Sequence, residues 1–155
     1  MKQLLAVLSF LALTAPIFAQ KPAATPPFRG AVSPSKMDPA EAKAGGVIYL
    51  RYCAACHGRT MLGDGPVASG LLNVATDLTT LAAKNGGKFP YDQVAAIIDG
   101  SKTSRIHGTP DMPVWGEVFA VTTGTEAPTA EAAVRRITHH VWSRQVKQAP
   151  AQGKK

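Results

Sequence analysis

Two cysteines and a histidine share one short run of this sequence, Cys53-Ala54-Ala55-Cys56-His57. Cys-x-x-Cys-His is the attachment signature of c-type haem. One turn of helix sets both thiols along one edge of the porphyrin, where each forms a thioether with a former vinyl group. His57 then projects its imidazole toward the iron from the same side. The spacing therefore predicts one haem c, attached covalently through Cys53 and Cys56 and ligated by His57.

Two other uses of paired cysteines fit this sequence less well. A redox-active Cys-x-x-Cys site occurs beside a βαβ pattern, which this chain lacks. A structural zinc site needs two further ligands at paired spacing, and His139-His140 has no second cysteine pair beside it. We read these two histidines as part of a solvated cationic face with one partly packed ring. Metal binding or a pH switch is the alternative.

The first twenty residues follow the order of a secretory signal peptide. Met1-Lys2 is a short basic start, Leu4–Leu13 is an uncharged apolar run, and small residues follow Pro16. We predict a cleaved leader over residues 1–19 and a periplasmic protein, because c-type haem is attached to exported chains. The alternative is a retained membrane anchor, although the uncharged stretch is only just long enough to span a bilayer and Pro16 interrupts it.

The rest of the chain divides into a linker, one domain and a tail. Four prolines among small and polar residues make residues 20–37 a flexible Pro-rich linker. Residues 38–147 carry the periodic apolar segments and form one domain, a number that suits a chain of 155 residues. Residues 148–155 are a basic C-terminal tail.

Apolar residues at helical spacing predict the elements that position the motif. A capping box formed by Asp38 and Glu41 begins the first helix, and Thr129 caps the last. The expected helices are 39–52, one or two turns within 77–84, 90–99 ended by Gly100, and 129–147, with residues 101–128 irregular. No run alternates as a strand does, so the class is all-α. The connections are so long that we expect a large apolar cofactor to fill the core.

The charge balance bears on the partners. The chain has 17 Lys and Arg against 10 Asp and Glu, and loss of the leader removes one lysine and leaves +6. No basic stripe with interleaved aromatic residues is present, which argues against a nucleic-acid partner. In an exported protein this charge favours redox partners with acidic docking surfaces, with peripheral contact to anionic lipid as a second use. Solubility alone explains the charge equally well.

Three segments together resemble a bacterial monohaem class I cytochrome c. They are CAACHG at 53–58, GDGP at 63–66 and HGTPDMPVWG at 107–116, and the resemblance extends over residues 38–147. It implies a cytochrome c fold, in which three to five short helices and long irregular loops surround one covalently bound haem. It also implies that Met112, in a Met-Pro pair, supplies the sixth ligand of the iron.

The positions of the methionines agree with that assignment. The chain without its leader has three, and Met61 follows His57 too closely to reach the opposite face of the ring. Met37 precedes the first helix, whereas Met112 follows a long irregular stretch that can wrap a haem. Thioether and imidazole are a known ligand pair of cytochromes c. His107, in the same loop, is the competing ligand.

The resemblance also implies supporting roles. Pro66 would offer its carbonyl to the Nδ1–H of His57, which would fix the tautomer of the ligand. Gly45 and Tyr49 would pack against the terminal helix at Ile137 and Val141. The family often has glycine where Met61 stands, so we expect a slightly different loop there, shaping the exposed haem edge.

Four further side chains suit the haem propionates. Trp115 and Tyr91 would donate hydrogen bonds to them, and Arg105 or Lys102 would pair with their charge. Each of the four is equally well explained as an ordinary packing or surface residue.

An iron with six ligands has no open position for a substrate, so the sequence predicts an electron carrier rather than an enzyme. Such a protein passes one electron between redox partners, as a monomer or as a subunit. One alternative is the haem c subunit of a periplasmic dehydrogenase, oxidase or sulfur-oxidising complex. Another is a haem peroxidase or gas sensor, which would require that Met112 leave the iron open.

Overall fold

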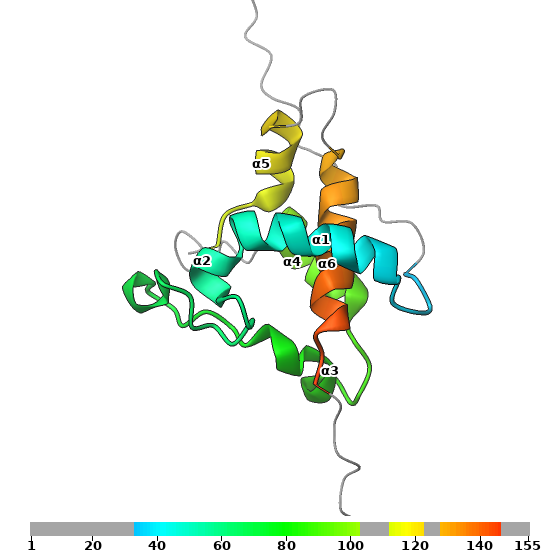
Figure 1. The fold of residues 1–155 in the computed structure, drawn as a ribbon, viewed down its shortest axis with the longest axis horizontal. Coiled ribbons are helices and arrows are strands. Elements are labelled where there is room, and N and C mark those ends of the chain that lie inside the picture. The colour runs from blue at the N-terminus through cyan, green and yellow to red at the C-terminus, as the bar shows by residue number, and fades with distance from the viewer. Residues whose placement is uncertain (1–32, 103–111, 123–127, 147–155) are drawn as a thin grey trace, which may run out of the picture.

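The computed structural model describes residues 33–102, 112–122 and 128–146, and within these ranges the protein is helical and has no strand (Figure 1). The predicted all-α class is therefore confirmed for the described part. The elements are α1 (Pro39–Tyr52), α2 (Ala54–His57), the 3₁₀ turns η1 (Ala68–Gly70) and η2 (Leu78–Thr80), α3 (Leu81–Lys84), α4 (Tyr91–Asp99), α5 (Trp115–Thr122) and α6 (Ala130–Ser143). No helix of the described residues is long and apolar enough to cross a membrane. The predicted leader, the tail and most of the linker lie outside these residues.

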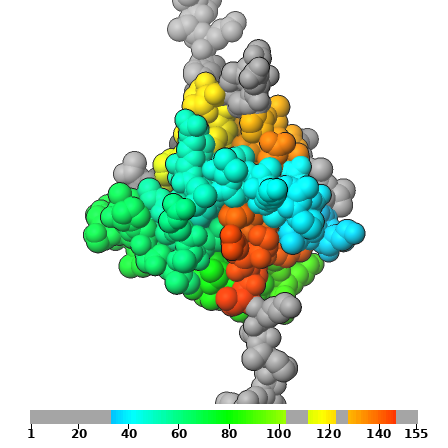
Figure 2. Space-filling model, viewed as in Figure 1, coloured from blue at the N-terminus to red at the C-terminus, as the bar shows by residue number. Residues whose placement is uncertain are grey.

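Helices α1 and α6 cross and make the largest helix–helix contact of the described fold. Figure 2 shows α1 lying across α6, with parts of α6 visible on either side. The crossing is close because Gly45 has no side chain, and a Cβ there would overlap the backbone carbonyl of Arg136. Tyr49, Ile137 and Val141 are buried at the contact. The predicted packing of Gly45 and Tyr49 against the terminal helix is thus confirmed.

The start of α1 differs from the predicted capping box. The carboxylate of Asp38 accepts the backbone N–H groups of Ala40 and Glu41 at 2.8 and 3.2 Å, as expected of an N-cap. The N–H of Asp38 donates instead to Nδ1 of His139, at 3.0 Å. Glu41 pairs with the Arg135 guanidinium, with 3.4 Å between Nε and Oε2. The reciprocal bond predicted for Glu41 is wrong because α6 offers both residues better partners.

His139 and His140 are buried, with 3% and 8% of their surface exposed, so the predicted solvated face is wrong at these positions. The ring of His139 packs edge-on against Tyr91 of α4. His140 places Nδ1 3.0 Å from the carbonyl oxygen of Ala42 and so donates to it. Because α6 packs against α1, α4 and α5, its buried surface is wider than one apolar stripe.

Residues 112–122, the longest described part of the stretch predicted to be irregular, contain a helix, α5 (Trp115–Thr122). Its Phe119 is buried, and both Trp115 and Phe119 pack edge-on against Tyr52 of α1. Gly116 lies so close to the backbone of Asp99 that a Cβ there would clash with it. The glycines and threonines around this helix conceal it in the sequence, although its aromatic residues have helical spacing.

The other helical predictions are confirmed. Helix α4 ends where expected, because Gly100 takes the left-handed conformation, with φ 89°. The turns η2 and α3 fill the expected short helical segment, and Thr129 caps α6 by accepting the N–H of Ala132. Helix α6 ends at Ser143, a few residues before the predicted boundary.

Candidate functional site

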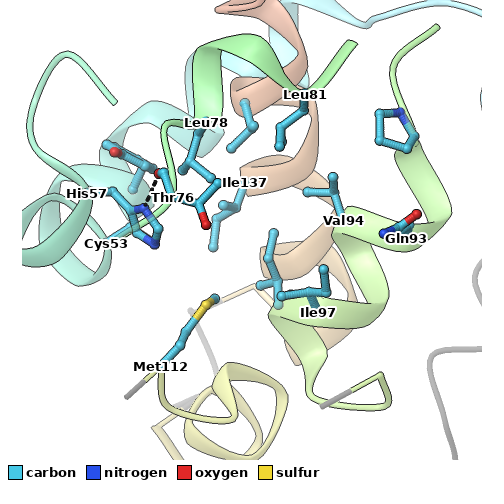
Figure 3. A pocket seen from close by; sticks show the side chains of 14 residues that line it. Cys53, His57, Thr76, Leu78, Leu81, Gln93, Val94, Ile97, Met112 and Ile137 are labelled. Carbon is cyan, nitrogen blue, oxygen red and sulfur yellow. Dashed lines mark hydrogen bonds between the residues drawn. The ribbon is translucent and has the colours of Figure 1, made fainter. Parts of the chain in front are cut away.

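An apolar pocket lies beside the Cys-x-x-Cys-His motif (Figure 3). Its cavity measures about 160 Å³. About 720 Å³ of empty space lies between the walls when the open mouth is included. None of the lining residues carries a charged carboxylate, ammonium or guanidinium group. They are Tyr49, Cys53, His57, Thr76, Leu78, Leu81, Pro90, Gln93, Val94, Ile97, Ile98, Met112, Ile137 and Val141.

Both cysteines of the motif lie on one helical turn beside this pocket, as the sequence predicts. Cys53 separates α1 from α2, and its carbonyl oxygen accepts the N–H of His57 at 2.9 Å. Cys53 is buried in the pocket wall, whereas Cys56 is half-buried, and both are free thiols. Burial raises the pKa of the Cys53 thiol to about 12. That shift is opposite to the lowered pKa of redox-active Cys-x-x-Cys sites.

The imidazole of His57 is held by a single backbone carbonyl. Its Nδ1 lies 3.0 Å from the oxygen of Thr76, the contact drawn as a dashed line in Figure 3. A carbonyl oxygen only accepts, so Nδ1 carries a proton, and in the neutral ring Nε2 has the lone pair. This is the tautomer in which Nε2 binds a metal while the second nitrogen donates to a carbonyl.

The expected partner of His57, the carbonyl of Pro66, is therefore replaced by that of Thr76. The loop after α2 turns back along the motif, where Gly65 N–H donates to Cys56 O and Val67 N–H donates to Ala55 O. These bonds fix the backbone on both sides of Pro66 against α2. Pro66 is exposed and does not line the pocket.

Two residues of the same loop let the Thr76 segment pass close to His57. Gly63 has φ 83°, and a Cβ there would overlap the carbonyl of Ala75. The carbonyl of Met61 accepts the N–H of Leu78 at 2.8 Å. Met61 itself has φ 69°, a left-handed conformation that glycine adopts more easily.

The side chain of Met61 is 1% exposed and does not line the pocket, so its predicted place at an exposed edge is wrong. Met37, half-buried, lies beside a surface hollow against α6 instead. Among the methionines that the structure describes, Met112 alone lines the pocket. Figure 3 shows its sulfur directed into the space that His57 faces from another wall. The structure thus brings together the two side chains predicted to be iron ligands.

The side chains suggested for the propionates are placed less favourably. Trp115 is half-buried and stacks on Phe119, with 5.8 Å between ring centroids, and Tyr91 is buried against Trp142. Neither lines the pocket, so their role in the described structure is packing. Lys102 is exposed. The other two predicted candidates, Arg105 for a propionate and His107 for the iron, lie outside the described residues.

Sequence reasoning missed the role of Thr76, because a backbone carbonyl leaves no trace in residue type. The sequence predicts Leu78 and Leu81 on a short helical segment, but nothing local shows that they face a pocket. The apolar face of α4 was visible in the helical spacing of Val94 and Ile97, and it does form one wall.

The residues fit a c-type haem. The pocket is apolar and is bordered by one motif cysteine, by an imidazole whose Nδ1 is engaged with a backbone carbonyl, and by a thioether sulfur. These are the side chains that attach and ligate such a haem. Comparison of the chain with the models of known families, with curated proteins and with solved structures finds no match.

Proposed function

We propose that this protein is an exported electron carrier of the monohaem class I cytochrome c type, with its haem bound through Cys53 and Cys56. The observation that carries the proposal is that one apolar pocket is lined by Cys53, His57 and Met112. When bound, the haem supplies a reversible one-electron change between Fe(III) and Fe(II).

The two proposed ligands have complementary effects. His57 donates its Nδ1–H to Thr76, which raises the basicity of Nε2 and fixes the plane of the ring. Met112 contributes a neutral thioether, which raises the reduction potential relative to a second nitrogen ligand. Together His57 and Met112 would hold the iron of a bound haem and leave it no position for a substrate, which suits electron transfer.

The pocket walls support the same function. Aliphatic side chains from α3, α4 and α6 border the cavity, and no charged side chain lines it. A low-dielectric wall disfavours the added charge of oxidised iron and so raises the potential.

The charge of the chain indicates the kind of partner. A net charge of +6 without the leader attracts proteins with acidic docking surfaces. Association steered by exposed charges is fast and weakens as salt screens them, with a Debye length of ~8 Å at physiological ionic strength.

Covalent attachment is the first consequence to test. The full chain is expressed together with a haem-attachment system, and its intact mass is measured under denaturing conditions. Wild type should carry one haem, and the double variant Cys53→Ala/Cys56→Ala should carry none.

Ala55→Ser is the matched control, because it changes an exposed residue inside the motif and leaves both thiols in place. It should retain the haem. A wild-type chain without covalent haem, or a double variant that keeps it, would overturn the proposal.

A further inference from the structure

Gln145 follows Arg144, the C-cap of α6, and connects the C-terminal end of this helix to the pocket wall. Its Nε2 donates to the carbonyl oxygens of Leu78 and Val141, at 2.7 and 2.8 Å. Its Oε1 accepts the N–H of Ala82 at 2.8 Å. Both amide hydrogens and the amide oxygen are thus engaged. The next residue adds a fourth bond, from Val146 N–H to Thr79 O at 3.0 Å.

The segment that Gln145 holds, residues 76–82, forms part of the proposed haem site. Its first residue, Thr76, accepts the Nδ1–H of His57. Leu78 and Leu81 line the pocket (Figure 3). The loop after α2 holds this segment through the bond from Leu78 N–H to Met61 O. Gln145 holds the same residue through the Leu78 carbonyl, which accepts from its Nε2.

We infer that Gln145 is a positioning residue for the haem ligand His57. It fixes the backbone at Leu78 and Ala82, which in turn fixes the Thr76 carbonyl against Nδ1 of His57. This inference rests on the proposed function, because the property it controls is the basicity of an iron ligand.

The direction of the effect follows from the hydrogen bond. A well-placed carbonyl makes the imidazole a stronger donor, which stabilises Fe(III) over Fe(II). Without Gln145 the Thr76 carbonyl is less restrained, so its hydrogen bond to the Nδ1–H of His57 weakens. The weaker bond stabilises Fe(II) relative to Fe(III). Loss of a direct partner of a metal-ligating histidine changes metal affinity or activity by ~10–100-fold. Gln145 acts one step further away, so we expect a shift of about three- to tenfold.

The test compares neutral variants of the holoprotein, so that no added charge contributes to the potential. Gln145→Met keeps the length of the side chain and loses all three hydrogen bonds. Gln145→Asn is one methylene shorter and is the milder change if the methionine variant yields no holoprotein. Ser143→Ala is the matched control, because the Ser143 hydroxyl donates only to His140 O within α6.

Two quantities are measured: the ratio of reduced to oxidised haem at one fixed applied potential, and amide hydrogen exchange at Ala82. Both Gln145 variants should raise the ratio and speed the exchange, the methionine variant by about threefold or more in the ratio. Ser143→Ala should match wild type. Gln145 variants with the wild-type ratio, or an equal shift in Ser143→Ala, would overturn the inference. Wild type without covalent haem would defeat the proposed function instead.

Discussion

The chemistry proposed here depends on one contact of one side chain. His57 donates Nδ1–H to the Thr76 carbonyl, which leaves Nε2 free toward the pocket. No side chain of the Thr76 segment makes this bond, so its strength depends on how closely the backbone can approach. Gly63 permits the approach, because any side chain at this position would overlap the carbonyl of Ala75.

Gly63→Ala should therefore destabilise the holoprotein more than conformational strain alone explains. A left-handed φ costs an alanine about 1–2 kcal/mol. Gly86 is the matched control, because it also has a positive φ, 65°, but has open space around its missing Cβ. Denaturant unfolding should show a loss of about 1 kcal/mol for Gly86→Ala and at least twice that for Gly63→Ala. Equal losses for the two variants would contradict the close approach.

At the scale of elements, the crossing of α1 and α6 positions the motif. Helix α1 ends at the residue before Cys53, and both helices supply pocket walls, through Tyr49, Ile137 and Val141. The crossing also buries His139 and His140. Burial lowers the pKa of both imidazoles from the ordinary value of 6.5. At His139, the carboxylates of Asp38 and Glu41 raise the pKa and so oppose the shift, whereas Arg135 lowers it further. At His140, Arg144 lowers the pKa further.

These histidines make the stability of the fold depend on pH. In the unfolded chain they take up protons near pH 6.5, whereas in the folded protein they do so only at lower pH. Their contribution is complete above pH 6.5, and it is lost as the pH falls through the lowered native values. The free energy of unfolding should therefore drop as the pH falls below the ordinary histidine value of 6.5.

Urea unfolding of the holoprotein at several pH values measures this dependence. The double variant His139→Gln/His140→Gln should show a shallower drop than wild type, because glutamine does not titrate. The amide oxygen at position 139 can still accept the N–H of Asp38. Parallel curves for the two proteins would show that other groups cause the pH dependence.

The elements that could be predicted from the sequence are those with local signals. Asp38 and Thr129 cap their helices, Gly100 ends α4, and apolar residues recur at helical spacing in α4 and α6. In α1 the predicted apolar side is partly wrong, because Val47 and Leu50 are exposed. The Cys-x-x-Cys-His motif likewise carries its chemistry in five consecutive residues. These features can be predicted without knowledge of the fold, because each involves residues that are near one another along the chain.

The features that were missed depend on contacts distant in sequence. Helix α5 is stabilised by aromatic packing of Trp115 and Phe119 on Tyr52, in a stretch whose composition favours loops. The partner of His57 lies 19 residues away along the chain, and that of Gln145 at Ala82 lies 63 residues away. Neither the burial of a face nor the position of a carbonyl can be deduced from residue type alone.

At the scale of the whole molecule, helices joined by long connections surround an apolar cavity. The cavity lies among α1, α3, α4 and α6 and is bordered by His57 and Met112. A bound haem would take the place of packing between these walls. With His57 and Met112 both bound to its iron, the haem would show the optical absorption of a His/Met-ligated cytochrome c.

The optical spectrum of the oxidised and reduced holoprotein tests this account most directly. We predict a weak iron–methionine absorption at the red end of the oxidised spectrum, lost in Met112→Ala, which should still carry covalent haem. Met37→Leu is the control and should keep the absorption, because Met37 lies outside the pocket. If wild type lacks it, and its reduced iron binds carbon monoxide readily, the sixth position is open and the electron-carrier account is contradicted.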